Sequence, residues 1–129
     1  MTHSRLIIAA VLGATMLSPA AAQAPARTPP TQIITLWSFD YAPKPIHLRA
    51  GAPVTLAFVN RADSGHDFTA REFFANSRMI AGAAPDGKIR LRGGEAKSVT
   101  LVPRAGRYAV HCSHMFHKQL GMRDLIVVD

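Results

Sequence analysis

One stretch near the end of the chain gathers side chains that bind soft metal ions. Residues 110–122 read VHCSHMFHKQLGM and hold the only cysteine of the sequence, three of its six histidines and two of its five methionines. Thiolate and thioether sulfur suit Cu(I), and imidazole nitrogen also accepts Cu(II). Two histidines and one cysteine in a trigonal set, with a distant methionine, form the copper sites that transfer electrons. This stretch therefore predicts a site for a single copper ion.

The spacing of these residues supplies three of the four ligands. Cys112 is followed by His117 after four intervening residues, and by Met122 after four more. The second histidine must come from another strand. His66, in the segment NRADSGHDF just past an apolar run that ends at Asn60, is the candidate. The predicted metal ligands are therefore His66, Cys112, His117 and Met122.

Three further donors in the stretch leave an alternative open. His114 lies only two positions after Cys112, which is a tight geometry for chelation, so we favour His117 and keep His114 as the competitor. Met115 is interpreted as a core residue or as part of an exposed apolar patch. His111 points to the opposite face from Cys112, and the sequence lacks the His-x-His pairs that a second copper cluster needs, so we interpret His111 as structural or solvent-exposed.

The segments that position these residues have the pattern of β-strands. Between residues 31 and 129, short apolar stretches with a period of two are broken by Gly, Pro and Asn, which is typical of strands. Seven to eight such strands in one domain predict an all-β fold, a Greek-key β-sandwich. The segment AREFFANSRMIAG, residues 70–82, is predicted as a short helix or an irregular loop. Trp37 is predicted to lie in the core.

Strand alternation also predicts where the cysteine points. In GRYAVHC, residues 106–112, Tyr108, Val110 and Cys112 share one face. Because successive side chains of a strand point to opposite faces, Cys112 is expected to enter the sandwich near one end.

The beginning of the chain reads as a targeting segment. Residues 1–22 have a basic start, an apolar run from Leu6 to Leu17, and small residues at the end, which is the pattern of a secretory signal peptide. The alternative is a membrane anchor, but the run is shorter than the ~20 residues that span a bilayer. Residues 23–30 are predicted as a flexible leader and residues 31–129 as the domain. We expect a periplasmic protein with no membrane span after cleavage.

The charge of the chain limits the kinds of partner molecule that we expect, and its cysteine content bears on whether it binds a metal. The formal net charge is +7, and the basic residues are scattered singly, so with export we exclude nucleic acid and favour an acidic protein partner. One cysteine cannot form an internal disulfide. In an oxidising compartment an unpaired thiol needs to be buried or bound, which again favours a metal.

These motifs together resemble the cupredoxins, the blue-copper proteins of the plastocyanin and azurin type. The resemblance rests on GHDF (65–68), GRYAVHC (106–112), His117 and GMRDLIVV (121–128), and it covers residues 31–129. The four residues between the cysteine and the second histidine are similar to the longer-loop members, such as auracyanin and rusticyanin. The loop lacks the proline that often precedes the family's second histidine.

The resemblance implies a role for each residue of the site. His66 and His117 bind copper through ring nitrogens, Cys112 through its thiolate, and Met122 as the weak axial ligand. It also places Asp67 where the family has a hydrogen-bonding side chain. We expect Asp67 to accept from the backbone or hydroxyl of Ser113.

The predicted function is that of a small exported type 1 copper protein that carries single electrons between periplasmic redox partner proteins. One copper ion cycles between Cu(I) and Cu(II), and we expect a monomer. Four protein ligands leave no open position for a substrate, so we do not expect an enzyme. The main alternative is a copper-binding protein that sequesters or delivers the metal, which the surplus donors favour. A metal-free domain that acts by contact is a third reading.

Overall fold

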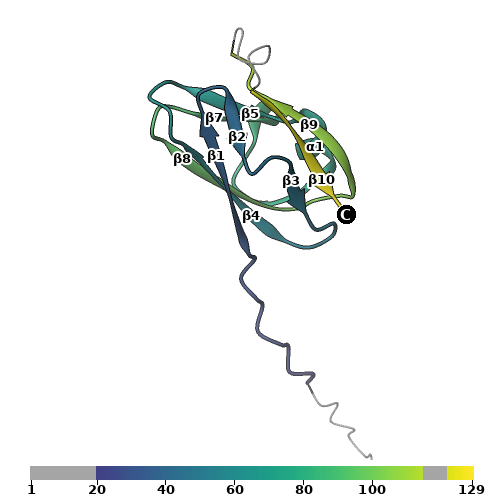
Figure 1. Cartoon of the computed structure of the whole chain (residues 1–129). Helices are drawn as coiled ribbons and strands as arrows, with labels where there is room; N and C mark the ends of the chain where they lie inside the picture. The colour runs from purple at the N-terminus through teal and green to yellow at the C-terminus, as the bar shows by residue number, and fades with distance from the viewer. Residues whose placement is uncertain (1–19, 115–121) are drawn as a thin grey trace, which may run out of the picture.

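The computed structural model describes residues 20–114 and 122–129, which form two five-stranded sheets packed face to face (Figure 1). In sheet order, the first consists of β2 (Asp40–Ala42), β1 (Thr31–Trp37), β4 (Val54–Asn60), β8 (Ala96–Val102) and β6 (Arg78–Ala81). The second consists of β3 (Ile46–Leu48), β10 (Arg123–Val128), β9 (Gly106–His111), β5 (His66–Thr69) and β7 (Lys88–Leu91).

The predicted all-β sandwich is confirmed, and the described residues form ten strands where the sequence indicated seven or eight. The additional strands are β2, β5 and β6, of three or four residues each. The pairs β1–β4 and β3–β10 are parallel, and the other strand pairs are antiparallel.

The short helix predicted within residues 70–82 is present in the first part of that segment, whereas residues 78–81 form strand β6. Helix α1 (Arg71–Asn76) buries Phe73 and Phe74, and the Phe73 ring packs edge-on against Tyr108 with centroids 5.6 Å apart. A short 3-10 turn, η1 (Pro85–Gly87), precedes β7. The helix thus adds two aromatic rings to the core that the sheets enclose.

The two-residue period places the core side chains as expected, with one exception. Val110 and Cys112 are each 1% exposed, whereas Arg107 of the same strand is exposed. The prediction that Trp37 is a core residue is wrong, because its side chain is 46% exposed. Ile34 and Leu36 fill the inner positions of β1, so the alternation turns Trp37 outward.

The chain reaches the sandwich through an extended segment. Residues 20–30 contain no helix or strand and lead away from the sandwich (Figure 1). Most of the predicted signal peptide, residues 1–22, lies outside the described residues and stays a prediction. Within residues 20–114 and 122–129, no helix is long and apolar enough to cross a membrane.

Strand direction gathers the site at one end of the sandwich. Strands β4 and β9 end there, and β5 and β10 begin there (Figure 1). His66, Cys112 and Met122 are therefore neighbours in space although they are far apart in sequence.

Candidate metal centre

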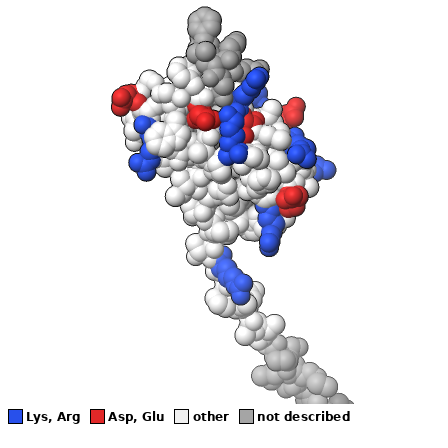
Figure 2. Space-filling view, viewed as in Figure 1, with Lys and Arg blue, Asp and Glu red and all other residues white. Residues whose placement is uncertain are grey.

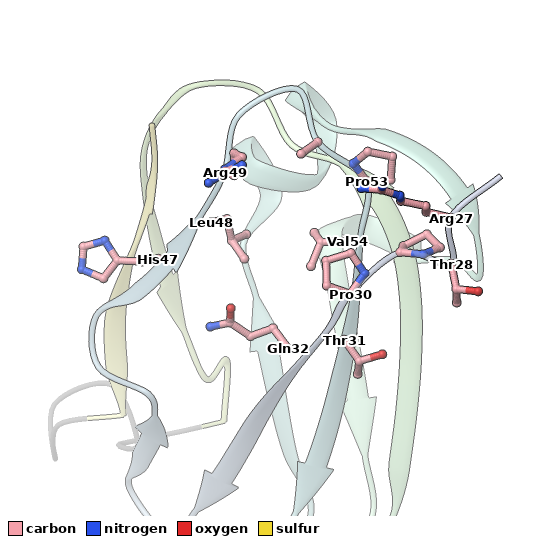
Figure 3. Close-up of a pocket in the computed structure, with 12 residues that line it drawn as sticks. Arg27, Thr28, Pro30, Thr31, Gln32, His47, Leu48, Arg49, Pro53 and Val54 are labelled. Carbon is pink, nitrogen blue, oxygen red and sulfur yellow. The ribbon is translucent and has the colours of Figure 1, made fainter. Parts of the chain in front are cut away.

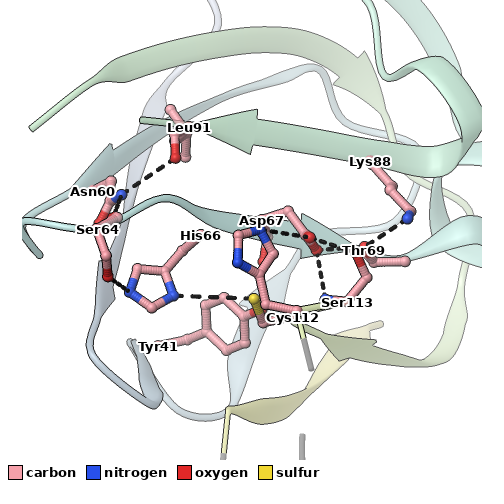
Figure 4. A network of polar contacts seen from close by, with 11 residues as sticks. Tyr41, Asn60, Ser64, His66, Asp67, Thr69, Lys88, Leu91, Cys112 and Ser113 are labelled. Atoms are coloured by element: carbon pink, nitrogen blue, oxygen red, sulfur yellow. Dashed lines mark hydrogen bonds and ion pairs between the residues drawn. The ribbon is translucent and has the colours of Figure 1, made fainter. Parts of the chain in front are cut away.

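His66 and Cys112 face each other inside the sandwich. The His66 side chain opens β5 and is 1% exposed. Its Nδ1 atom lies 4.0 Å from Sγ of Cys112, and its Nε2 atom lies 3.3 Å from Oγ of Ser64 (Figure 4). A d-block ion binds thiolate sulfur at about 2.3 Å and imidazole nitrogen at about 2.0 Å, as zinc does. The Nδ1 and Sγ atoms are therefore close enough to share one ion.

Asn60 fixes the loop that leads to His66. It ends β4 with a side chain that is 1% exposed. Its Nδ2 atom donates to the carbonyls of Ser64 at 2.8 Å and of Arg92 at 2.9 Å, and its Oδ1 atom accepts from the amide of Ala62 at 3.0 Å. No structural role for Asn60 was predicted from the sequence. The available signal was a polar residue at the end of an otherwise apolar strand just before the candidate histidine.

Asp67 joins the two ligand segments. Its Oδ1 atom accepts from the amide of Ser113 at 2.9 Å and from the hydroxyl of Thr69 at 2.6 Å. Its Oδ2 atom accepts from the hydroxyl of Ser113 at 2.5 Å. The predicted bond between Asp67 and Ser113 is confirmed for both the backbone and the hydroxyl group. The residue after His66 is thus tied to the residue after Cys112.

The charge state of Asp67 follows from these bonds. Burial alone raises the pKa of this carboxyl group, but the hydrogen bonds from Ser113 and Thr69 and the nearby His114 outweigh burial and lower the pKa. The carboxylate is therefore ionised at neutral pH and acts only as an acceptor.

Tyr41 supports the same segment from the other sheet. Its hydroxyl donates to the backbone carbonyl of Asp67 at 2.7 Å. Burial and the surrounding acidic groups raise the pKa of Tyr41, so the phenol stays protonated and can donate. Neither Tyr41 nor Thr69 was predicted from the sequence. The Tyr41 contact depends on how the two sheets pack, because β2 and β5 belong to different sheets, whereas Thr69 lies on β5 two residues after Asp67 and that spacing was the available signal.

Cys112 and Met122 lie side by side at this end. The Cys112 amide donates to the carbonyl of Met122 at 3.0 Å, and the two side chains are 1% and 0% exposed. Burial, with a contribution from the negative Asp67, raises the pKa of the Cys112 thiol. A thiolate at this position is costly without a compensating cation, and a coordinated metal ion would supply that charge.

His114 also lies at the site, on its exposed side. Ligand atoms of Asp67, Cys112 and His114 all lie within 4.8 Å of one another. Nε2 of His114 is 3.9 Å from Oδ2 of Asp67, and the ring stacks on His66 with centroids 6.2 Å apart. The structure therefore brings together His66, Cys112, Met122 and the alternative histidine. The favoured ligand His117, together with Met115, lies outside the described residues, so the choice between His114 and His117 stays a prediction.

The comparison with protein families decides the kind of protein. Residues 34–129 match the model of copper-binding proteins of the plastocyanin/azurin family. The chain belongs to this family. Copper, the predicted cofactor, is confirmed as the metal of the family, and the cupredoxin resemblance seen in the sequence is confirmed.

Solved structures share the cupredoxin fold. A dithionite-reduced auracyanin from the photosynthetic bacterium Roseiflexus castenholzii is 18% identical, with a TM-score of 0.59, and the match covers 81% of this chain and 99% of that one. Auracyanin B is 21% identical, with a TM-score of 0.58, covering 81% and 92%. A multicopper oxidase from Campylobacter jejuni is 14% identical, with a TM-score of 0.61, covering 81% and 31%. A search of the curated proteins gave no significant match.

The donor set of this cupredoxin fits copper. The Cys112 sulfur and the His66 Nδ1 atom face each other at one buried end of the sandwich, and the buried Met122 is joined to Cys112 through its backbone carbonyl. A thiol, an imidazole and a thioether are a mixture of soft and intermediate donors that suits both oxidation states. A separate hollow of about 410 Å³ lies at the opposite end, between the start of β1 and the strands β3 and β4 (Figure 3). Of the candidate ligands that the structure describes, His66, Cys112, His114 and Met122, none lines that hollow, so it is not an alternative location for these ligands to bind a metal.

Proposed function

We propose that this cupredoxin is an exported one-electron carrier that holds a single copper ion through His66, Cys112, His117 and Met122. The observation that supports it best is the 4.0 Å separation between Nδ1 of His66 and Sγ of Cys112. When bound, copper supplies a one-electron couple between Cu(I) and Cu(II).

The surrounding residues keep the donor atoms in place during an electron transfer. Ser64 contacts Nε2 of His66, which leaves Nδ1 directed at Cys112. The bonds between Asp67 and Ser113 hold the strands of the two ligands at a fixed separation. Hydrogen bonds around a metal site orient its ligands. A site held in this way needs little rearrangement when its charge changes, and that favours fast electron exchange.

The proposal includes the location and the partners of the protein. The signal-peptide pattern of residues 1–22 supports a periplasmic protein, and the excess of basic residues supports acidic redox partners. We propose that the protein itself transforms no substrate, because the four proposed ligands leave the metal no open position.

Copper handling is the second candidate function, and one observation favours it. His114 lies beside Asp67 and Cys112 and offers a donor beyond the proposed set. A carrier of copper should bind Cu(I) in ready exchange with a chelator, and it can take up more than one ion.

Stoichiometry and voltammetry separate the two functions. Residues 23–129, which contain every strand of the described structure, are loaded with copper and studied by metal analysis, voltammetry and competition with a Cu(I) chelator. We expect one ion per chain, a reversible one-electron wave and slow loss to the chelator. Several ions per chain, an irreversible wave and fast exchange would support copper handling instead.

A pair of matched variants tests the fourth ligand. His117→Ala should change the Cu(II) spectrum, and added imidazole should partly restore the spectrum of the wild type. His114→Ala should leave the spectrum close to that of the wild type. The reverse pattern would assign the ligand to His114.

A further inference from the structure

We propose that the basic side chains around β7 form a docking surface for an acidic electron-transfer protein. This β7 basic patch consists of Lys88, Arg90, Arg92 and Lys97. The inference rests on the proposed electron-transfer function and adds the place at which the partner binds.

The patch combines residues from both sheets. Strand β7 is the edge strand of the second sheet. Ile89 and Leu91 of β7 are buried in the core, so the alternation turns Lys88 and Arg90 outward. Lys97 belongs to β8 of the first sheet, and its Nζ atom donates to the carbonyl of Arg90 at 2.6 Å. This contact bridges the two sheets and brings the positive charges together.

The patch borders the metal centre. A hollow of about 430 Å³ has walls formed by two groups of residues: the site residues Gly65, His66 and His114, and the residues Arg90, Leu91, Arg92, Glu95 and Lys97. Lys88 reaches the site from the other side, since its Nζ atom donates to the hydroxyl of Ser113 at 3.1 Å (Figure 4). Ser113 directly follows Cys112 in the chain. A protein bound at the patch would therefore lie near two of the proposed ligands. Ser113 lies between Lys88 and Cys112, and the hollow lies between the arginines of the patch and the His66 ring.

The charges of the patch are poorly balanced within the protein. Among the described residues, no carboxylate forms an ion pair with Arg90 or Arg92. Among the described residues that line the hollow, Glu95 is the one acidic residue, and it interacts electrostatically with both Lys97 and Arg92. It already accepts from the Arg92 amide at 2.7 Å and lies 3.6 Å from Nζ of Lys97.

One face of the molecule mixes the two signs. On the face seen in Figure 2, acidic side chains lie among the basic ones, and Lys44 forms an ion pair with Asp40 at 2.8 Å. Like charges gathered without counter-charges repel one another, and an acidic surface on a partner relieves this repulsion and steers the encounter. Charge complementarity therefore favours an acidic protein as the occupant of the patch.

The first experiment locates the binding of acidic groups. A hexaglutamate peptide is titrated at low ionic strength into isotope-labelled residues 23–129, both metal-free and loaded with Cu(I), and backbone amide shifts are recorded. We expect the largest shifts at residues 88–92, at residue 97 and at residues 113–114. The variant Arg90→Gln/Arg92→Gln should weaken binding about fivefold, because it removes two of the positive charges that attract the peptide.

A matched control separates the patch from the overall charge. Arg49→Gln/Arg107→Gln also removes two positive charges, but from exposed positions away from the site. Arg49 directly follows β3, and Arg107 lies in β9. We expect this variant to bind the peptide almost as well as the wild type. Equal weakening by both variants, or shifts centred away from the patch, would overturn the proposal in favour of non-specific attraction.

The second experiment measures the electron transfer itself. The reduced copper protein is oxidised by the anionic hexacyanoferrate(III) ion and, in parallel, by a cationic cobalt(III) complex. Arg90→Gln/Arg92→Gln should slow the reaction with the anion by a factor similar to its loss of peptide binding, and it should not slow the reaction with the cation. If copper gives no redox reaction, the electron-transfer function fails while the peptide experiment still tests the patch. If the redox reaction is normal and both variants behave alike, only the docking proposal fails.

Discussion

The two ends of the sandwich are closed by different kinds of hydrogen bond. Apart from the hydroxyl groups of Tyr41 and Tyr108, the buried polar side chains of the described residues are those of Asn60, His66, Asp67 and Thr69, and all four lie at the metal end. The opposite end is closed largely by backbone groups. There, the amide of Ala50 donates to the carbonyl of Asp129 at 2.9 Å, and the amide of Gly51 donates to that of Pro103 at 2.9 Å.

This difference shows what the metal end requires. Burying a polar side chain is unfavourable unless its hydrogen bonds are satisfied. Backbone bonds close a loop with almost any sequence, but they cannot fix the separation between two particular side-chain atoms. The side-chain network at the metal end does so, because Asp67 joins the segments that carry His66 and Cys112. The comparison predicts that mutations at the metal end cost more stability than mutations at the opposite end.

The largest effect is expected for Asp67→Ala. The substitution removes the acceptor of the Ser113 amide, the Ser113 hydroxyl and the Thr69 hydroxyl. Losing this buried acceptor should lower the free energy of unfolding by about 3 kcal/mol, measured by urea denaturation of the metal-free chain. The exposed ion pair is the control, since Asp40→Ala should cost less than about 1 kcal/mol. A similar small cost for both would show that the buried network contributes no more to stability than an exposed ion pair.

The pH dependence of the same residue sharpens the comparison. Folding lowers the pKa of Asp67 below its ordinary value of 3.8. Its contribution to stability is therefore complete above that ordinary value and is lost as the pH falls through the lowered pKa. The difference in unfolding free energy between the wild type and Asp67→Asn should be constant near neutral pH and should shrink below about pH 4. A difference that instead grows on acidification would contradict the assigned direction.

A smaller loss is expected for Asn60→Ala. The Asn60 amide group donates to the carbonyls of Ser64 and Arg92, and its oxygen accepts from Ala62. Removing these bonds should lower the unfolding free energy by about 2 kcal/mol. The copper spectrum should also broaden, because the loop before His66 loses its support. An unchanged spectrum would show that Asn60 supports only the fold.

At the opposite end, Tyr108→Phe should have a modest effect. The Tyr108 hydroxyl donates to the carbonyl of Arg104 at 2.9 Å, and this bond lies away from the metal centre. Its loss should cost about 1 kcal/mol, and the copper spectrum should not change. A spectral change in this variant would mean that the two ends are coupled.

A small effect on stability is also expected for Met122→Leu. The side chain is fully buried, and a replacement of similar volume usually costs less than about 1.5 kcal/mol. The reduction potential of the copper-loaded protein should nevertheless change, because the axial ligand tunes it. A potential equal to that of the wild type would argue against Met122 as a ligand.

Local patterns in the sequence predicted much of this arrangement. Strand alternation placed Val110 and Cys112 inside, and the family motif predicted the bond between Asp67 and Ser113. The same alternation was misjudged for Trp37, because an aromatic side chain was taken as core without regard to its neighbours Ile34 and Leu36.

The rest depends on contacts between distant segments. The bond from the Tyr41 hydroxyl to Asp67 joins residues 26 positions apart, and the bond from Asn60 to the Arg92 carbonyl joins residues 32 apart. Neither contact leaves a periodic signal in the sequence, because each requires the two sheets and their loops to be placed first. The β7 basic patch also exists only once β7 and β8 are brought together.

Cys112 and His66 are proposed to bind one copper ion, and the visible absorption spectrum of residues 23–129 loaded with Cu(II) is the direct test. We expect an intense thiolate-to-copper charge-transfer band that is lost in Cys112→Ser, is altered in His66→Ala and is kept in the control His111→Ala. A loaded protein without this band, or a band that survives in Cys112→Ser, would show that Cys112 does not bind the copper.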